Sequence, residues 1–436
     1  MFSFITRWMH SSSTGSALLR VAHKFPRMRE LVLTFMDNIS VFTCRLKMGK
    51  VTFDPGKPTL LLCVHEASIS GAPVLGLNLA SKFSDEFNVV CMMLSGGALA
   101  ENFASLCTAT IAPRSGSVRD ASPALLERVI LTRVSQKFGL DAVLTNSVEC
   151  AAVVRSASIA RIPCLSLIHE FSEYSDPRRL TDTLALADKV VFSSEILARS
   201  ARSSSGFDDS KLVILPQGRS DPPASSKGES YTAYLTRPID AQEILCIGCG
   251  RVEMRKGPDL FISTAMAALR RNNKLRFVWI GDGYKPKSDI HYGFWLKDQI
   301  LRSGHDNNIE IIPALSGPHL VDLFRDAGMM LLSSRLDPLP NVALDALHEG
   351  VPTVCFDRAS GLVEYFQTDP VLKALVVPYL DTNAASETIC NLVGDAERRS
   401  AVSERCVLLA RSLFDMNDYV KKLNWHLADI RKGKVR

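Results

Sequence analysis

The sequence lacks any run of about 18 uncharged apolar residues, so none of its segments is expected to cross a membrane as a helix. It also lacks a strong excess of charge, because 51 Lys and Arg residues stand against 46 Asp and Glu, a formal net charge of +5. That near balance does not indicate nucleic-acid binding, and we expect no nucleic-acid partner. What is present is an ordinary globular composition, with 46% hydrophobic residues among 436, enough for two or three domains with large cores.

The chain also lacks the usual signs of a metal or disulfide framework. Its eleven cysteines are an odd number and are scattered through apolar runs, which favours reduced, buried thiols in a cytoplasmic protein. Cys246 and Cys249 form a C-x-x-C pair, but no second pair or nearby histidine completes a zinc site. There is no D-x-D pair either. These residues therefore predict no metal site.

Acidic residues are absent before Glu30. Residues 1–50 contain eight Lys or Arg residues against two acids, Glu30 and Asp37, and the C-terminal stretch RKGKVR is basic as well. We predict a basic N-terminal helical extension over residues 1–57 that contacts an anionic membrane surface. The alternatives are a solvated basic end with no partner and an organelle transit peptide, which the first residues resemble in composition. The expected location is cytoplasmic and, where the extension binds lipid, at the membrane.

From Pro58 onward, short apolar runs alternate with helical stretches, which predicts parallel sheets covered by helices on both faces. A Ser-, Pro- and Gly-rich stretch at 220–240 separates two such series and reads as a linker. The expected fold class is α/β, with two Rossmann-like domains at 58–225 and 240–410. The strand candidates are residues 59–64, 87–94, 141–146, 164–168, 189–194 and 212–215 in the first series and 243–250, 274–281, 309–315, 328–334 and 351–356 in the second.

Two acids, Asp337 and Asp345, stand in the stretch LLSSRLDPLPNVALDAL, between a strand and a predicted helix. Pro340 suits a helix start, and the amides of the following turn, at Asn341 and Val342, offer N–H groups and a positive dipole to a phosphate. The acids beside that turn suit the hydroxyl groups of a ribose and a sugar. By itself, the same spacing also fits a helix cap and a surface acid.

A second group of candidates follows the strand at 243–250, in the stretch GCGRVEMRKGPDL. Gly250, Arg251 and Lys256 leave the carboxyl end of that strand, where open parallel sheets bind ligands. Two cations there suit a diphosphate leaving group, although a basic loop at a helix start has the same appearance. Glu253 occupies the last glycine position of a G-x-G-x-x-G pattern, which argues against a dehydrogenase.

Smaller signals follow other strand ends. Gly71 opens a helix after the strand at 59–64, where a glycine lets a ligand approach the backbone closely. His169 lies just past another strand, where a histidine can hydrogen-bond a sugar, although a lone histidine is more often structural. Gly361 and Glu364 form a G-x-x-E after a further strand.

Taken in chain order, these motifs resemble glycosyltransferase family 4. The stretches that carry the resemblance are HEASISGAP, CLSLIHE, ILPQG, GRVEMRKGPDL, VWIGDG, DPLPNVALDALHEGVPTV and SGLVE. It covers roughly residues 58–415 and is most specific over 248–366. The resemblance implies a GT-B fold, in which two Rossmann-like domains face an interdomain cleft, retaining transfer of a sugar, and a C-terminal helix at 411–436 that packs back onto the first domain.

The resemblance also implies a role for each motif residue. Asp337 takes the place of an acid that hydrogen-bonds the transferred sugar, and Asp345 that of an acid on the nucleotide ribose. Arg251 and Lys256 match a basic pair on the donor diphosphate. His169 matches a histidine that lines the sugar site, and with Arg251, Lys256 and Asp337 it makes up the expected catalytic set. The other donor-binding positions implied are Gly71, Gly250, Gly283, Pro340, Asn341, Val342, Gly361 and Glu364.

The implied activity is that of a hexosyltransferase, which moves a sugar from a nucleoside-diphosphate sugar to a saccharide or lipid-linked acceptor in polysaccharide or lipopolysaccharide assembly. The leaving diphosphate takes the acceptor proton in a front-face substitution, so the scheme needs no metal and no cofactor. Both acids are Asp where the family has Glu, which sets each carboxylate back by about 1.5 Å, one carbon–carbon bond. This departure leaves two alternatives open: a GT-B nucleotide-sugar epimerase, and a catalytically silent GT-B subunit that binds a partner or a membrane.

Overall fold

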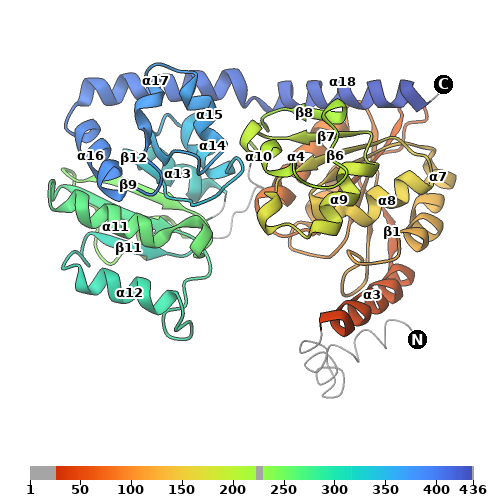
Figure 1. The fold of residues 1–436 in the computed structure, drawn as a ribbon, viewed down its shortest axis with the longest axis horizontal. Helices are drawn as coiled ribbons and strands as arrows, with labels where there is room; N and C mark the ends of the chain where they lie inside the picture. Colours follow the sequence, from red (N-terminus) through yellow and green to blue (C-terminus); the bar gives the residue numbers. More distant parts are fainter. Residues whose placement is uncertain (1–25, 222–228, 316, 435–436) are drawn as a thin grey trace. The chain divides into compact units, whose positions relative to one another are not determined.

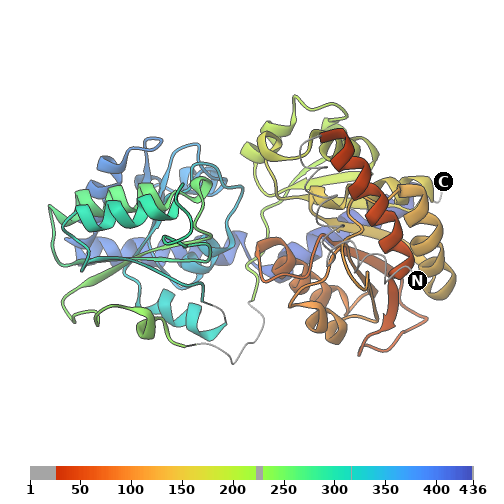
Figure 2. The ribbon, with the colours of Figure 1, turned by 90° about the horizontal axis from the view of Figure 1, so that it is seen from below.

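The chain forms two compact units (Figure 1). The structure, a computed structural model, describes residues 26–221, 229–315 and 317–434. Unit 1 consists of the described residues within Met1–Ser193, Leu197–Leu215 and Asn417–Arg436, and unit 2 of those within Ser194–Ile196 and Pro216–Met416. In each unit, helices cover both faces of a sheet (Figure 1, Figure 2).

Unit 1 is built on an eight-stranded sheet in the order β1-β4-β3-β2-β5-β6-β7-β8, parallel throughout except for the antiparallel pair of β1 and β4. Its strands are β1 Arg45–Met48, β2 Thr59–Val64, β3 Asn88–Met93, β4 Ala109–Ala112, β5 Leu140–Asn146, β6 Cys164–Ile168, β7 Lys189–Phe192 and β8 Leu212–Ile214. Its helices are α3 Pro26–Thr43, α4 Gly71–Phe83, α5 Ala100–Leu106, α6 Pro123–Leu126, α7 Thr132–Phe138, α8 Ala151–Ile159, α9 Pro177–Leu186, most of α10 Glu195–Ala201, and α18 Met416–Lys434.

Unit 2 is built on a six-stranded parallel sheet in the order β11-β10-β9-β12-β13-β14. Its strands are β9 Ile244–Cys249, β10 Leu275–Ile280, β11 Ile309–Ile312, β12 Met329–Leu332, β13 Thr353–Phe356 and β14 Val376–Val377. Its helices are α11 Pro258–Leu269, α12 Gly293–Arg302, α13 Pro318–Asp326, α14 Asn341–His348, α15 Leu362–Gln367, α16 Thr382–Val393 and α17 Ala396–Leu413.

The apolar runs form the central strands because they are buried on both faces. All six residues of β2 are buried, as are those of β3 and β10, and only a strand between two helical layers can bury every side chain in this way. On one side of the unit 2 sheet, Phe261 of α11 packs edge-on against Phe277 and Trp279 of β10, with ring centroids 5.7 and 5.4 Å apart. The predicted α/β class and the two Rossmann-like units agree with this architecture.

Three strands were not anticipated. β4 and β14 are short, with four and two residues, and β1 is largely basic, so none shows a long apolar run. β1 lies inside the segment 1–57 that we expected to be a helical extension, and there it pairs with β4 as the edge strand of the unit 1 sheet. Residues 1–25 of that segment lie outside the described residues.

The boundaries of the units also differ from the expected ones. Unit 2 begins at Pro216 rather than near residue 240, because residues after β8 contact unit 2: the Arg219 amide donates to the Phe414 carbonyl at 2.8 Å. The C-terminal helix α18 begins at Met416, and from Asn417 onward it belongs to unit 1. There, Lys189 at the start of β7 pairs with Asp429 at 2.5 Å.

The strand order fixes where each unit can bind a ligand. From β2 in unit 1 and from β9 in unit 2, the chain starts in the middle of the sheet, moves outward to one side and then returns to continue on the other, while β1 lies at the edge of the unit 1 sheet beside β4. The switch points lie between β2 and β5 in unit 1 and between β9 and β12 in unit 2. Crevices at the carboxyl ends of such strand pairs are the ligand sites of open α/β sheets. Most of the predicted site residues follow these four strands.

Candidate functional site

The centre of the unit 2 site is Asp337, in the loop that follows β12. Its side chain is almost fully buried, with the residue 4% exposed. Lys256 donates to one carboxylate oxygen at 2.6 Å, and the Ser334 hydroxyl donates to the same oxygen at 3.0 Å. Arg255 lies 3.4 Å from the other oxygen. The loops after β9 and β12 are therefore joined by a buried ion pair at the switch point.

The charges around Asp337 keep its carboxyl group ionised. Burial alone would raise its pKa, but the Lys256 ammonium, the Arg255 guanidinium and the hydrogen bonds from Lys256 and Ser334 together hold the pKa below its usual value. At neutral pH the Lys256 charge is therefore balanced by an anion of the chain itself. Any phosphate that binds Lys256 does so beside a second negative group, in competition with it.

Gly250 lacks a side chain where the Lys256 side chain passes close to its backbone. It follows β9 with φ +148°, and a Cβ placed on it would meet the Lys256 side chain at 3.3 Å. The Gly250 carbonyl accepts a hydrogen bond from the Trp279 indole at 3.0 Å, which fixes the loop to β10. The backbone conformation and the close approach both favour glycine here.

Arg251, unlike Lys256, forms no ion pair with a residue that the structure describes. Its side chain is exposed, and no ion pair or side-chain hydrogen bond involves it within residues 26–221, 229–315 and 317–434. Gly283, in the loop after β10, lies beside it, with a Cβ built on Gly283 falling 3.6 Å from Arg251 Cγ. Of the predicted cation pair, Arg251 presents a charge to solvent and Lys256 holds Asp337.

The turn that opens α14 has Pro340 as its capping residue, followed by Asn341 and Val342. The fixed φ of proline suits this position, and the Pro340 carbonyl accepts the first helical hydrogen bond, from Ala343 at 3.0 Å. Gln217 was not singled out from the sequence. Its side-chain amide donates to the Leu339 carbonyl at 3.1 Å and to the Asn341 side chain at 2.5 Å, so it ties the turn to the segment after β8.

Asp345, one turn into α14, is already paired. Arg219 donates to it at 3.1 Å and to Glu349, one turn further on, at 3.3 Å. Burial raises the pKa of Asp345 to about 6 and outweighs the opposing effect of Arg219, and the charges of Asp221 and Glu349 add smaller increases. Sequence reasoning missed Arg219. The only signal was its position just after the motif ILPQG.

The two residues of the G-x-x-E motif, Gly361 and Glu364, contact different parts of the chain. The Gly361 amide donates to the Pro338 carbonyl at 2.7 Å, so Gly361 lies against the Asp337 loop. Glu364 instead accepts hydrogen bonds from the amides of Glu195, at 2.8 Å, and of Ile196, which belong to the short segment assigned to unit 2. Its carboxylate thus caps the start of α10.

In unit 1, Gly71 and His169 are joined through Asn146. The Asn146 amide donates to the Ala72 carbonyl at 2.6 Å, next to the first residue of α4, and its oxygen lies 2.8 Å from His169 Nε2. Burial and the charge of His65 lower the pKa of His169 to about 4, so the ring is neutral near pH 7. Gly71 follows β2, Asn146 is the last residue of β5 and His169 follows β6, around the switch point of unit 1.

Glu170, next to His169, is held by hydrogen bonds at the same switch point of unit 1. It accepts a hydrogen bond from the Ser147 hydroxyl at 2.5 Å and others from the amides of Val148 and His169. Burial raises its pKa, and these hydrogen bonds oppose the rise. Asn146 and Ser147 were not predicted, because they read as the end of an apolar strand.

The predicted residues thus gather at one site in each unit. Unit 2 brings together Lys256, Asp337, Gly250 and Gly361. Arg251 lies on the same loop as Lys256, Gly283 lies on the neighbouring loop after β10, and the turn that begins α14 and Asp345 within that helix follow the Asp337 loop. Unit 1 holds Gly71 and His169. No helix of the described chain is long and apolar enough to cross a bilayer, and its described residues contain no group of three or more His, Cys, Asp or Glu side chains arranged to hold a metal.

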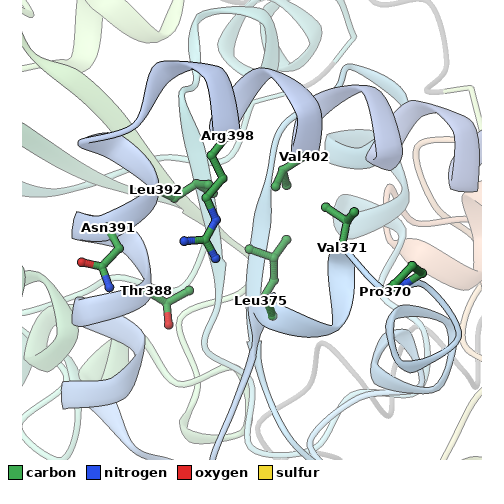
Figure 3. A pocket seen from close by; sticks show the side chains of 9 residues that line it. Pro370, Val371, Leu375, Thr388, Asn391, Leu392, Arg398 and Val402 are labelled. Atoms are coloured by element: carbon green, nitrogen blue, oxygen red, sulfur yellow. The ribbon is translucent and has the colours of Figure 1, made fainter.

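A separate pocket in unit 2 contains none of these residues. It is lined by the 3-10 helix η7 Leu372–Leu375 with the two residues before it, and by α16 and α17. The Arg398 side chain points from α17 into the space between Leu392 and Leu375 (Figure 3). The full lining is Pro370, Val371, Ala374, Leu375, Thr388, Asn391, Leu392, Arg398 and Val402.

Residues 237–406, nearly the whole of unit 2, match the family model described as glycosyl transferases group 1. This stretch of unit 2 is thus similar to glycosyl transferases group 1, a family of transferase enzymes. The matched stretch contains Arg251, Lys256, Asp337, Asp345 and the G-x-x-E motif.

Curated relatives include two proteins named D-inositol 3-phosphate glycosyltransferase. The one from Saccharomonospora viridis is 26% identical over 178 residues, which cover 40% of this chain and 41% of that protein. The one from Kineococcus radiotolerans is 25% identical over 289 residues, 62% of each. The matches thus span between two fifths and three fifths of the length of these relatives.

Solved structures resemble the chain over most of its length. Alr3699/HepE from Anabaena, in complex with UDP and glucose, matches 85% of this chain and 99% of its own with a TM-score of 0.66 at 16% identity. Sucrose-phosphate synthase from Thermosynechococcus elongatus matches 86% and 100% with a TM-score of 0.67 at 15% identity. WaaG, a glycosyltransferase involved in lipopolysaccharide biosynthesis, matches 84% and 98% with a TM-score of 0.59 at 14% identity. The predicted GT-B fold is confirmed.

Proposed function

We propose that the chain is a retaining glycosyltransferase of family 4, which transfers a hexose from a nucleoside-diphosphate sugar to a saccharide or lipid-linked acceptor in polysaccharide or lipopolysaccharide assembly. The observation that carries this proposal is the group of charged residues at the β9/β12 switch point. An exposed arginine, a lysine and a helix start lie there beside the buried Asp337 and the partly buried Asp345. Cations suit a diphosphate, and carboxylates suit the hydroxyls of the sugars on either side of it.

In this reaction the acceptor hydroxyl oxygen bonds to the anomeric carbon as the bond from that carbon to the phosphate oxygen breaks. The acceptor proton passes to the leaving diphosphate, on the same face of the sugar. Arg251, Lys256 and the amides of the α14 turn stabilise the charge that develops on that diphosphate. Asp337 orients the transferred sugar and Asp345 the ribose. The scheme uses charges of the chain itself, and we propose that it needs no metal ion.

The buried pair of Lys256 and Asp337 suggests that Lys256 exchanges Asp337 for the leaving diphosphate during the reaction. Asp337 holds it at 2.6 Å in the absence of donor, and the leaving diphosphate competes for it as its charge grows. An interaction that is stronger in the transition state than in the ground state raises the rate, whereas equal binding of both does not. The transferred sugar would then engage the Asp337 oxygens that Lys256 releases.

The proposal does not specify the nucleotide base of the donor. UDP is the first nucleotide to test, because the HepE structures contain UDP. The assay incubates the protein with UDP-glucose and oligosaccharide or lipid-linked acceptors, detects product by mass spectrometry and reads the anomeric configuration by NMR. A product that keeps the donor configuration supports the proposal. Inversion at the anomeric carbon contradicts retention, and turnover of the donor without an acceptor favours an epimerase.

A silent subunit is the second candidate, and one observation favours it. Both acids at the site are already paired, Asp337 with Lys256 and Asp345 with Arg219. A site whose charges satisfy each other is stable without a ligand. Nucleotide binding without turnover of any donor and acceptor pair would establish this reading in place of the first.

A further inference from the structure

The pocket between η7, α16 and α17 lies within unit 2 and shares no lining residue with the candidate donor site. It encloses about 220 Å³. That volume is below the roughly 300–1,000 Å³ of pockets that bury drug-sized ligands. The pocket therefore suits a molecule smaller than a nucleotide sugar.

The floor of the pocket is apolar. Leu375 of η7, Leu392 of α16 and Val402 of α17 line it, and each is 2% exposed. All three side chains belong to the hydrophobic core of unit 2. An apolar group of a ligand that settles on this floor is removed from water, which favours binding.

The nine described residues that line the pocket include one cation, Arg398, and no acid. The Arg398 side chain points from α17 into the space between Leu392 and Leu375 (Figure 3). Its backbone amide donates to Asp395 at 2.9 Å, but its guanidinium makes no ion pair or hydrogen bond with a residue that the structure describes. The pocket thus presents an unpaired positive charge beside an apolar floor.

Two polar side chains of α16, Thr388 and Asn391, lie on one side of the pocket (Figure 3). The Thr388 hydroxyl donates to the Ala384 carbonyl at 2.9 Å, so its oxygen remains able to accept a hydrogen bond. Asn391 is exposed, and its amide group makes no hydrogen bond with any residue in the described ranges. A side-chain amide can donate two hydrogen bonds to an anion that Arg398 holds.

The opposite side of the pocket is fixed by Asp369. Its carboxylate accepts hydrogen bonds from the amides of Val371 and Leu372, at 2.8 and 3.0 Å, and from Arg405 Nε at 3.0 Å. The charge of Asp369 is therefore balanced by Arg405 and does not compete for Arg398. A wall that is held in this way needs little ordering when a ligand binds, which lowers the cost of binding.

We propose that this pocket binds a small oxyanion, a carboxylate or a phosphate ester, that is joined to a compact apolar group. The Arg398 guanidinium holds the charged oxygens through paired hydrogen bonds, and the apolar group covers Leu375, Leu392 and Val402. The inference goes beyond the proposed sugar transfer, because it gives unit 2 a second ligand at a separate place. Its test measures binding alone, so it can fail or succeed whether or not the chain transfers a sugar.

The experiment is a ligand-observed NMR titration of the full-length protein with benzoate and with phenyl phosphate, which carry the same ring on a carboxylate and on a phosphate. We expect a roughly millimolar dissociation constant for at least one of them, and the tighter of the two identifies the charged group that the pocket prefers. Acetate and inorganic phosphate lack the ring, and benzyl alcohol lacks the charge. These three probes should bind at least about tenfold more weakly, because each makes only one of the two contacts.

Two variants test the pocket, each with a matched control. Arg398→Gln should weaken binding of the preferred probe about 10- to 100-fold, whereas Arg411→Gln, at an exposed arginine of the same helix, should not. Ala374→Phe fills the pocket from its exposed side and should abolish binding, whereas Lys373→Phe, at the neighbouring exposed residue outside the lining, should not. Circular dichroism melts identify any variant that fails to fold. Arg398→Gln changes only an exposed side chain, so it tests the proposal even where Ala374→Phe is unstable.

The proposal fails if neither benzoate nor phenyl phosphate binds, or if the probe binds equally well to the Arg398→Gln and Ala374→Phe variants. Equal losses in Arg411→Gln and Lys373→Phe would also contradict it, since those residues do not line the pocket. A probe that UDP displaces, or that no longer binds to Arg251→Gln, occupies the candidate donor site instead. Retained binding in Arg251→Gln, together with loss in Arg398→Gln, would establish the second site.

Discussion

Replacing Lys256 by methionine removes one charge from the buried pair and keeps most of the side-chain volume. Asp337 would remain 4% exposed, with Ser334 and the more distant Arg255 as its only charged or hydroxyl partners in the described site. Breaking a buried pair by removing one partner costs about 3–5 kcal/mol. Because Arg255 stays at 3.4 Å, we expect a value near the lower end, about 3 kcal/mol at neutral pH.

The pH dependence follows from the direction of the Asp337 pKa shift. Because the pKa of Asp337 in the folded state lies below its ordinary value of 3.8, the pair contributes stability that is fully present above pH 3.8 and is lost as the pH falls through the folded-state pKa. The difference in unfolding free energy between the unchanged protein and Lys256→Met should therefore be largest near pH 7. It should close in acid, where Asp337 takes up a proton and no longer needs a partner.

The assay is urea unfolding followed by fluorescence at several pH values, with Lys297→Met on exposed α12 as the matched control. In turnover, the same variant should lose on the order of 2–4 kcal/mol of transition-state stabilisation, roughly 30- to 1000-fold in rate. Unchanged stability at neutral pH, or a difference that grows as the pH falls, would refute the reasoning about the pair. Full activity would remove Lys256 from the mechanism.

The other predictions concern single residues of the two sites. Arg251→Ala, at the exposed cation, should lower turnover by a similar 2–4 kcal/mol with little effect on stability, and unchanged turnover would exclude it from the diphosphate site. Arg219→Met should raise the pKa of Asp345 above its value of about 6, so the pH below which UDP binding weakens should move upward. If the midpoint of UDP affinity against pH does not move, the contact between Arg219 and Asp345 is contradicted. His169, with its pKa near 4, should contribute no step to the pH–rate profile between pH 5 and 8, and a step in that range that disappears in His169→Gln would contradict the neutral ring. Gly257→Ala, at φ +70° against the Ser333 carbonyl, should destabilise unit 2 by about 1–3 kcal/mol in urea unfolding, and a neutral effect would contradict the strained geometry.

The sequence allowed the central strands to be predicted because their signal is local. A run such as TLLLCV at 59–64 can only be buried on both faces, and β2 occupies those residues. The polar residues that follow such runs lie at the carboxyl ends of strands, so Lys256 and Asp337 could be assigned to one crevice before their 2.6 Å contact was known.

What could not be predicted depends on contacts between distant parts of the chain. Arg219 and Asp345 are 126 residues apart, and Glu364 caps amides 169 and 168 residues before it. The local sequence pattern of neither segment predicts such a pairing. The edge strand β1 escaped prediction for the same reason, since RLKM becomes a strand only by pairing with β4.

The most direct test of the central claim, a nucleotide-sugar donor site in unit 2, is the binding of nucleoside diphosphates. A thermal-shift panel with UDP, GDP, ADP, their common sugar conjugates and NAD needs no knowledge of the acceptor. A ligand at 100 times its dissociation constant stabilises by about 2.7 kcal/mol, which shifts the melting temperature by a few degrees. We predict a shift with one nucleoside diphosphate and its sugars that is lost in Asp345→Ala. If none of them shifts the melting temperature, unit 2 does not bind a nucleotide-sugar donor.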